Sequence, residues 1–393
     1  MIILHIDVNS AFLSWTAVDL LEKGYETDIR TIPAIIGGDS SLRHGIVLAK
    51  SIPAGKLGIK TADPIASAMK KCPTLHIESP DFNIYKKASK SFIDYLHSFT
   101  PDIEQVSIDE CYLDYTPIMH KYGDPLDFAN KIKTEIKSFF GFTVNVGISD
   151  KKVLAKMASD FEKPDKIHTL YSYEIQEKMW PLPISDLFMC GKSSTKALYN
   201  LGIKTIGDLA QSDVSIIESN LKSIGLLLHN FANGIDDSVI ETVHEQRKGL
   251  GHATTLSHDV INREEAIPIL RELSNKISYD LRKEGMKGPL ITVELKYSDF
   301  TKHSQQHNLN VMTNSSNLIF NSAIKLFDTL WDQSPIRLIG IRISKLQTDD
   351  EPVQLSIFDF QDSDEHNPKF DKLDKALDSM RLKYGKDAIK KGF

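Results

Sequence analysis

Hydrophobic and polar residues in the first half of the chain follow two spacings, one typical of strands and one typical of helices. Residues 1–7 (MIILHID) and 142–149 (FTVNVGIS) predict strands, and 105–115 (QVSIDECYLDY) has strand character. The segment 10–24 predicts an amphipathic helix with Ser10 at its N-cap and Gly24 as its terminator. Further helices are predicted near 84–98, near 126–139 and from about residue 152. This order of strands and helices predicts an α+β sheet domain, in which the Gly- and Pro-rich residues 30–80 form a small subdomain.

The second half of the chain divides into three parts. Residues 184–234 predict short helices separated by glycine, and 235–246 read as a linker. Residues 247–346 follow the order β, α, β, β, α, β, which predicts a separate domain of about 100 residues. The remainder, 347–393, is an acidic tail with a possible helix near 368–384.

Composition is that of an ordinary globular protein. The chain has 393 residues, of which 41% are hydrophobic and 25% charged, which predicts two or three domains. No apolar run approaches the roughly 20 residues that span a bilayer, and the N-terminus lacks the basic region of a signal peptide. The three cysteines form no CxxC pair, so we expect a reduced, cytoplasmic setting and no zinc site.

Charge is distributed unevenly along the chain. The net charge of −6 argues mildly against a nucleic-acid partner. However, residues 347–368 carry seven acids and no Lys or Arg, whereas 247–346 hold 14 Lys and Arg against 10 Asp and Glu. This separation leaves nucleic-acid binding open.

Three carboxylates are the strongest chemical signal. Asp7 ends one predicted strand, and Asp109 and Glu110 are adjacent within an apolar run. If the strands are neighbours, the acids converge, and their repulsion calls for cations such as Mg²⁺, which prefers oxygen ligands. Two ions about 3.5–4 Å apart would suit an in-line phosphoryl displacement. The alternative is that each acid is a solvated residue at a strand end.

Three motifs carry a family resemblance. HIDVNSAF (5–12), SIDECYLD (107–114) and VGISDKKVLAKMASDFEKP (146–164) resemble, in order and spacing, the three catalytic motifs of the bacterial Y-family translesion DNA polymerases, the polymerase IV/UmuC group. The resemblance continues through 184–210 and 247–346. It implies a right-hand polymerase with a palm (1–10 and 77–168), small fingers (11–76), a helical thumb (169–234), a linker (235–246), a βαββαβ little finger (247–346) and a tail (347–393).

The resemblance also implies roles for the residues of the site. Asp7, Asp109 and Glu110 would be the catalytic acids and, with the Val8 carbonyl, would hold two Mg²⁺ ions. A primer 3′-OH would then attack the α-phosphate of a dNTP. The residues expected near the nucleotide are the amides of Ser10 and Ala11, the aromatic steric gate Phe12, Ser51, Lys56, and Lys163 on the triphosphate. Without the resemblance, Phe12 reads as a buried helix residue and Lys163 as a surface lysine.

The fingers motif departs from the family. Many relatives have a Tyr-x-x-Arg run, whereas SIPAGKLG (51–58) has Ile52 and Gly55 at those two positions. Lys56 or Lys50 would be a substitute point charge without arginine's bidentate fork. We therefore expect weaker nucleotide binding or a different fingers geometry.

Contacts to DNA are expected from both later domains. LFMCGKSSTKALYNLGIKTIGDL (187–209) resembles the thumb's helix-hairpin-helix, in which Gly191 and Lys192 would contact phosphates. Met189 replaces the usual first hairpin glycine, which predicts a distorted hairpin. In the little finger, Arg247, Lys248, Arg337 and Arg342 match phosphate-binding positions; charges on a solvated sheet face are the alternative.

A short apolar motif lies in the acidic tail. QLSIFDF (354–360) resembles the peptides that bind the bacterial sliding clamp, through Gln354, Leu355, Ile357 and Phe358. Packing of these residues onto the little finger is the alternative. The expected partners are primer-template DNA, dNTP and the clamp, with no membrane, and we expect a monomer.

Two functions are therefore compared. The leading hypothesis is a low-fidelity, template-directed DNA polymerase without proofreading that performs translesion synthesis. The alternative is a catalytically impaired DNA- and clamp-binding regulator built on the same fold. Retention of Asp7, Asp109, Glu110 and Lys163 together favours the enzyme.

Overall fold

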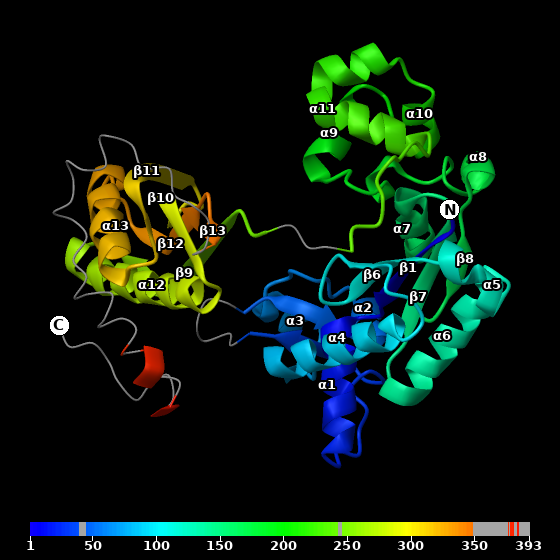
Figure 1. Cartoon of the computed structure of the whole chain (residues 1–393), viewed down its shortest axis with the longest axis horizontal. Coiled ribbons are helices and arrows are strands. Elements are labelled where there is room, and N and C mark those ends of the chain that lie inside the picture. The colour runs from blue at the N-terminus through cyan, green and yellow to red at the C-terminus, as the bar shows by residue number, and fades with distance from the viewer. Residues whose placement is uncertain (39–44, 243–245, 349–375, 377, 381–382, 385–393) are drawn as a thin grey trace. The chain divides into compact units, whose positions relative to one another are not determined.

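The strand β1 (Ile3–Val8) lies at the centre of the sheet on which the rest of the N-terminal half is built (Figure 1). The computed structural model describes residues 1–38, 45–242, 246–348, 376, 378–380 and 383–384. Contacts divide these residues into two units, one ending at residue 242 and one starting at 246. Each unit is described separately.

The first unit contains a five-stranded sheet in the order β5-β6-β1-β7-β8. All neighbours are antiparallel except β7 and β8. Its other strands are β5 (Ile103–Gln105), β6 (Glu110–Asp114), β7 (Val144–Ser149) and β8 (Ile167–Thr169). The helices around it are α1 (Ala11–Glu22), α4 (Phe82–His97), α5 (Met119–Tyr122), α6 (Pro125–Phe140) and α7 (Lys152–Asp160). The predicted strands and helices of this region are thus confirmed, with ends that differ by a few residues.

One predicted strand is interrupted. The segment 105–115 is not continuous, because residues 106–109 form a turn in which the amides of Val106 and Ser107 both bond to the Glu110 carbonyl. Asp109 therefore precedes β6, and only Glu110 belongs to the strand. The turn keeps two adjacent like charges from both occupying a strand.

The two faces of the sheet differ in chemistry because strand residues alternate in direction. On β1, Leu4, Ile6 and Val8 belong to the main core, which also contains residues of α4 and α6. Ile3, His5 and Asp7 therefore face the other way, and Ile3 packs with Ala155 of α7. The face covered by α7 is the one that carries charged and polar side chains.

Gly147 on β7 allows α7 to lie unusually close to the sheet. A Cβ atom at this position would lie 2.0 Å from the Ala155 carbonyl oxygen and 2.5 Å from the Ser159 nitrogen. Both atoms belong to the backbone of α7, so neither can move without moving the helix. The residue type at position 147 therefore fixes the distance between α7 and the sheet.

The Gly- and Pro-rich region forms a separate small sheet. Its strands, in the order β3-β2-β4, are β2 (Ala34–Gly37), β3 (Val47–Lys50) and β4 (His76–Glu78). Two short helices, α2 (Ile52–Lys56) and α3 (Ile65–Lys71), pack on it around a small core of their own. The expected subdomain is therefore present.

Short helices follow β8, as predicted. They are α8 (Ile175–Lys178), α9 (Lys192–Asn200), α10 (Ile206–Ala210) and α11 (Val214–Ala232), with 3-10 turns at Ser172–Glu174 and Ile184–Asp186. A further 3-10 turn, Thr116–Ile118, lies between β6 and α5. In Figure 1, α9, α10 and α11 form a helical group beyond the edge of the sheet. Residues 236–241 of the predicted linker return to the sheet domain, where the Asp236 carboxylate accepts a hydrogen bond of 2.9 Å from the Val153 amide.

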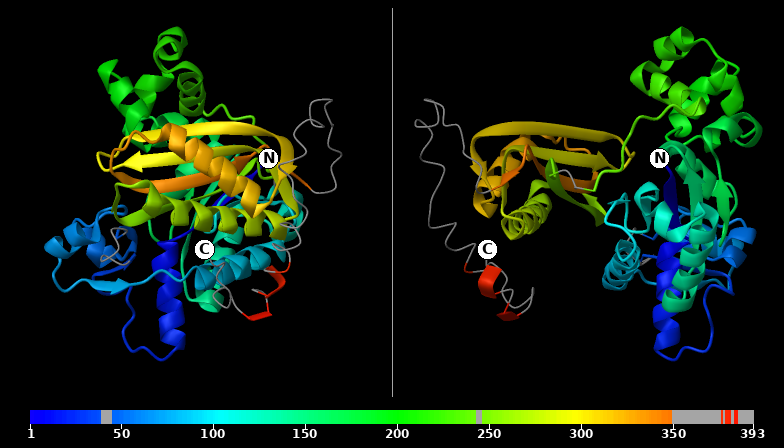
Figure 2. Two further views of the ribbon diagram at one scale, coloured as in Figure 1. Left: turned by 90° about the vertical axis from the view of Figure 1, so that its left-hand side faces the viewer. Right: turned by 45° about the vertical axis from the view of Figure 1, so that its right-hand side comes forward.

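The second unit has the predicted order β, α, β, β, α, β. It consists of β9 (Gly249–Val260), α12 (Arg263–Lys283), β10 (Met286–Tyr297), β11 (Lys302–Thr313), α13 (Ser316–Leu330) and β12 (Ile336–Ser344), with the short β13 (Gln347–Thr348) beside β10. The antiparallel sheet has the order β11-β10-β12-β9, and both helices contribute to one core against it (Figure 2). No helix in the described parts of either unit is long and apolar enough to cross a membrane.

The close packing at Gly147 generates a prediction about stability. Gly147→Ala should lower the free energy of unfolding by about 3 kcal/mol, because the added methyl group overlaps helix backbone. Urea denaturation measures the change. Gly55→Ala is the matched control: its Cβ would meet only the flexible end of Lys50, at 3.5 Å, so stability should change by less than about 1 kcal/mol. An equal loss in both variants would show that the close approach of α7 is not the cause.

Candidate active site

Three neighbouring strands place a polar residue at the same level of the sheet. Asp7 of β1 is paired with Glu110 of β6 on one side and with Asn145 of β7 on the other. Because residues paired across a sheet point to the same face, all three lie on the side covered by α7. We call Glu110, Asp7 and Asn145 the polar row.

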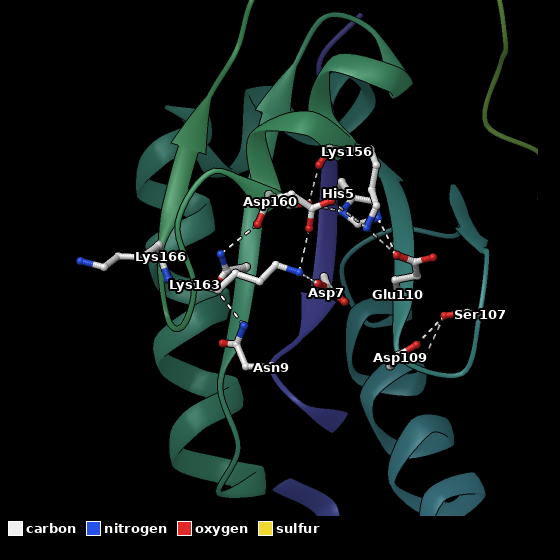
Figure 3. Close-up of polar contacts among 12 residues, drawn as sticks. His5, Asp7, Asn9, Ser107, Asp109, Glu110, Lys156, Asp160, Lys163 and Lys166 are labelled. Carbon is white, nitrogen blue, oxygen red and sulfur yellow. Dashed lines mark hydrogen bonds and ion pairs between the residues drawn. The ribbon is translucent and has the colours of Figure 1, made fainter. Parts of the chain in front are cut away.

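Asp7 is buried and compensated by a lysine. Only 8% of the residue is exposed, and its carboxylate forms an ion pair with Lys163, from the loop after α7. Lys163 also contacts the Asp160 carboxylate at 2.8 Å. Burial alone would lower the pKa of Lys163, but the carboxylates of Asp7 and Asp160 outweigh it and raise that pKa. The lysine is therefore charged and held at the centre of the site (Figure 3).

Glu110 contacts two other groups. The Lys156 ammonium of α7 lies 2.8 Å from its Oε2, and His5 Nε2 lies 3.4 Å from the same oxygen. The His5 imidazole and the Lys156 ammonium lower the pKa of Glu110 to about 2. Burial lowers the pKa of His5, whose Nδ1 lies 2.8 Å from the Ser159 hydroxyl. Its Nε2, although 3.4 Å from Glu110, makes no hydrogen bond to any residue that the structure describes. Glu110 is thus an ionised carboxylate beside a neutral imidazole.

Asp109 is next to the row but turned toward its own loop. The Val8 amide donates a 3.0 Å hydrogen bond to the Asp109 carbonyl, so the two backbones are adjacent. The Asp109 carboxylate accepts a 2.6 Å hydrogen bond from the Ser107 hydroxyl (Figure 3). Burial, together with the nearby carboxylates of Asp7 and Glu110, raises the pKa of Asp109.

The backbones of the three acids are adjacent, as expected, but their carboxylates do not converge on one point. Asp7 pairs with Lys163 and Glu110 with Lys156, whereas the Asp109 carboxylate is hydrogen-bonded to Ser107. Consequently, no group of three His, Cys, Asp or Glu side chains in the described residues is arranged to hold a metal ion. The chemistry of the donors nevertheless fits a hard divalent cation, because carboxylate oxygens and the Val8 carbonyl are its preferred ligands. Such an ion requires the acids to exchange their present partners.

The start of α1 lies directly after Asp7. Ser10 is its N-cap residue, as predicted, but its φ of 46° is left-handed and its side chain makes no capping hydrogen bond. The first turn of α1 also contains no acidic residue, so the positive end of the helix is not compensated there. Ala11 is buried, and the ring of Phe12 is stacked on Tyr85 with centroids 4.4 Å apart. Phe12 is thereby held in one orientation.

Of the fingers residues expected near the nucleotide, one is buried and one is exposed. Ser51 is 2% exposed, and its hydroxyl donates to the Ile32 carbonyl and accepts from the Ala54 amide, so it caps α2 and has a structural role. Lys56 is exposed at the end of α2. The Lys50 amine lies 3.5 Å from the point that a Cβ of Gly55 would occupy. A lysine thus borders the space that a side chain at position 55 would use.

Comparison with known proteins identifies the family. The impB/mucB/samB family matches residues 6–160, and its C-terminal domain matches residues 247–357. The chain is 46% identical over 388 residues to DNA polymerase IV of Clostridium acetobutylicum, covering 99% of this chain and 96% of that protein. It is 36% identical over 396 residues to DNA polymerase IV of Clostridium kluyveri, covering 100% and 97%. The chain belongs to the DNA polymerase IV family.

The fold agrees with this membership. A solved Y-family DNA polymerase chimera based on Dbh matches with a TM-score of 0.77, covering 88% of this chain and 100% of that chain at 24% identity. A Dbh ternary complex matches with a TM-score of 0.60. The expected α+β polymerase fold is therefore confirmed. As a member of the DNA polymerase IV family, the protein is a DNA-directed DNA polymerase of the translesion type.

The segment expected to be the helix-hairpin-helix has a turn at Met189, where the usual glycine is missing. Met189 adopts a φ of 69°, in the left-handed region that favours glycine. Gly191 is the N-cap of α9, and Lys192 is exposed at its first position. This conformation costs about 1–2 kcal/mol for a residue with a side chain. The distorted hairpin stays a prediction.

The basic residues of the second unit are in two places. Arg247, Lys248 and Arg342 border an open hollow of about 650 Å³ together with Lys345, and Arg247 also pairs with Glu284 at 2.9 Å. Arg337 lies elsewhere, with its guanidinium 4.9 Å from the centre of the Phe300 ring. Arg342 is exposed, and its guanidinium lies against Gly249. The polymerase thus presents a concentration of positive charge at this hollow.

Sequence reasoning missed three residues of the site. The binding of the sliding clamp by the tail stays a prediction. Lys156, His5 and Asn145 contact the acids or share their row. The signals that could have found them were the polar position of Asn145 within an alternating strand and the seven-residue spacing from Lys156 to Lys163. The clamp-binding residues Gln354, Leu355, Ile357 and Phe358 lie outside the described residues.

Proposed function

We propose that this polymerase adds deoxynucleotides to a primer by two-metal nucleotidyl transfer, at low fidelity and without proofreading. The observation that carries the proposal is the pairing of Asp7 with Glu110, with Asp109 adjacent, on one buried face of the sheet. Carboxylates so placed repel one another and are stable only when positive charge accompanies them.

Asp7, Asp109, Glu110 and the Val8 carbonyl would hold two Mg²⁺ ions. Bound there, the ions would neutralise the triphosphate and favour ionisation of the attacking 3′-OH. Asp7 and Glu110 would exchange Lys163 and Lys156 for these ions. Lys163, released from Asp7, would lie beside the triphosphate and stabilise the charge that develops on it.

Other residues near Asp7 would select and bind the nucleotide. The amides of Ser10 and Ala11, at the N-terminus of α1, would donate to phosphate oxygens. Phe12, held by Tyr85, would exclude a 2′-hydroxyl from the sugar position. Lys56 would supply a long-range positive charge from the fingers, whereas Ser51 would contribute only by shaping α2.

The domains would have the roles expected of a right-hand polymerase. Residues 1–10 and 77–168 would be the palm, 11–76 the fingers, 169–234 the thumb and 247–346 the little finger. Gly191 and Lys192 in the thumb would position duplex DNA through its phosphates. Arg247, Lys248, Arg337 and Arg342 would do so in the little finger, and the tail motif 354–358 would bind the sliding clamp.

The catalytic acids give the first test. Asp109→Ala combined with Glu110→Ala should reduce primer extension with Mg²⁺ by at least about 10³-fold, because no ligand set would remain for the ions. Affinity for primer-template DNA, measured by fluorescence anisotropy, should change less than about twofold, since phosphate contacts lie elsewhere. Asp114→Asn, at the far end of β6, is the matched control and should extend normally. Undiminished synthesis by the double variant would refute the assignment of these acids as metal ligands, whereas no primer extension by the parent protein would favour the regulator hypothesis.

Sugar selection gives a second test. Phe12→Ala should raise incorporation of ribonucleotides relative to deoxynucleotides by at least about tenfold, because the ring no longer fills the space beside the sugar C2′. Single-nucleotide insertion kinetics with dCTP and CTP measure the ratio. Phe139→Ala, an exposed ring on α6, should leave the ratio unchanged. If both variants discriminate as the parent does, Phe12 is not the steric gate.

DNA binding by the second unit gives a third test. Arg342→Ala should weaken binding to primer-template DNA, and the slope of log K against log salt should become shallower by about 1, the value for one phosphate contact. Binding titrations from low to high NaCl measure the slope. Arg263→Ala, which removes an arginine of α12 that is paired with Asp328 of α13, should leave the slope unchanged. Equal slopes for the parent and Arg342→Ala would place this arginine outside the interface.

A further inference from the structure

The loop that carries Lys163 is held by side chains rather than by a backbone ladder. It joins α7, which ends at Asp160, to β8, which begins at Ile167, and it contains no helix or strand. A loop without regular structure has no fixed path of its own. The position of Lys163 relative to Asp7 must therefore come from the groups that bind the loop.

Asn145 of the polar row binds the beginning and the end of this loop. Its Nδ2 donates to the Ser159 carbonyl at 2.9 Å and to the Glu162 carbonyl at 2.7 Å, and its Oδ1 accepts from the Lys166 amide at 3.3 Å. The side chain is completely buried. One amide group thus fixes backbone on both sides of Lys163.

Asn9 extends this arrangement from the other strand. Its Nδ2 donates to Asn145 Oδ1 at 3.0 Å, and its Oδ1 accepts from the Asp165 amide at 2.9 Å and from the Thr143 hydroxyl at 2.9 Å. Asn9 lies two residues after Asp7, and Asn145 is paired with Asp7 across the sheet. The strand positions that locate the carboxylate therefore also locate the two amides that hold the loop.

We infer that Asn9 and Asn145 are positioning residues that set the place of Lys163 at the active site, and thereby the affinity for the incoming dNTP. The inference rests on the proposed contact between Lys163 and the triphosphate. A purely structural role would predict a loss of stability with no effect specific to the nucleotide. The two roles are separated by asking whether the asparagine acts through the lysine.

The experiment is a double-mutant cycle in the full-length protein. The measured quantity is the Kd of the complementary dNTP, with Mg²⁺, on a primer-template ended by a dideoxynucleotide, so that binding is observed without chemistry. Lys163→Met should weaken binding about tenfold and Asn145→Ala about fivefold, as expected for losing or misplacing one charged contact. The double variant should be no weaker than Lys163→Met alone, because the asparagine acts only through the lysine.

A matched control comes from the same strand. Ser149 is also completely buried on β7, and its hydroxyl donates to the Leu170 carbonyl and, at the longer distance of 3.2 Å, to the Asp150 carboxylate. Ser149→Ala should lower thermal stability while leaving the dNTP affinity unchanged. Asn145→Ser serves as the second variant if the alanine variant does not fold, because serine keeps a polar group and loses less volume than alanine does. It lacks the amide that binds the loop, so it should also weaken dNTP binding.

Each possible failure has a distinct meaning. Losses that add in the double variant, or an unchanged Kd in both asparagine variants, would overturn the positioning role while leaving the role of Lys163 intact. An unchanged Kd in Lys163→Met would instead overturn the proposed triphosphate contact, and the inference with it. Faster amide hydrogen exchange at residues 165 and 166 in Asn145→Ala would support the role of the amide in fixing the loop.

Discussion

The close approach of α7 to β7 and β1 is the constraint on which the site depends. Gly147 permits it, because any side chain there would meet the backbone at Ala155 and Ser159. Once α7 lies at this distance, Lys156 reaches Glu110, and the loop after the helix brings Lys163 to Asp7. A wider separation would leave both carboxylates without their cations. The geometry of the site thus follows from a steric property of one strand residue.

Charge balance explains how this geometry can be stable. A buried carboxylate without a partner is costly, and removing one member of a buried ion pair destabilises a protein strongly. Lys163 compensates Asp7, and Lys156 compensates Glu110. In the proposed reaction, Asp7 would exchange a lysine for a metal ion, while Lys163 would exchange a carboxylate for a phosphate. Lys156, on losing Glu110, would keep the Asp160 carboxylate, 3.5 Å away, as its partner.

The sequence predicted most of the fold because its signals are local. The alternation in 142–149 and the periodicity of 10–24 depend only on neighbouring residues, and the three acids proposed as catalytic were identified from short motifs. The partners of the acids could not be predicted, because the Lys156–Glu110 pair depends on how far α7 lies from the sheet. Asn145 was missed for a related reason: a polar residue in an alternating strand reads as solvated unless the register that pairs it with Asp7 is known. Met189 shows a further limit, since its left-handed backbone could not be predicted for a residue with a side chain.

The position of α7 is fixed along its whole length, not only at the glycine. At its first turn, the amide of Val153 donates to Asp236, a carboxylate from the chain that leaves the helical group, and a negative charge is favourable at this end of a helix. Lys152 adds contacts to Glu104 and to the Val239 carbonyl. At its last turn, the Ser159 carbonyl accepts from Asn145.

Because the two lysines of the site belong to this helix and to the loop that follows it, their distances from Asp7 and Glu110 are set by contacts at both ends of α7 and at its middle. A helix held only by apolar packing could slide or rotate by an ångström, which is enough to separate an ammonium from a carboxylate; these directional bonds oppose that movement.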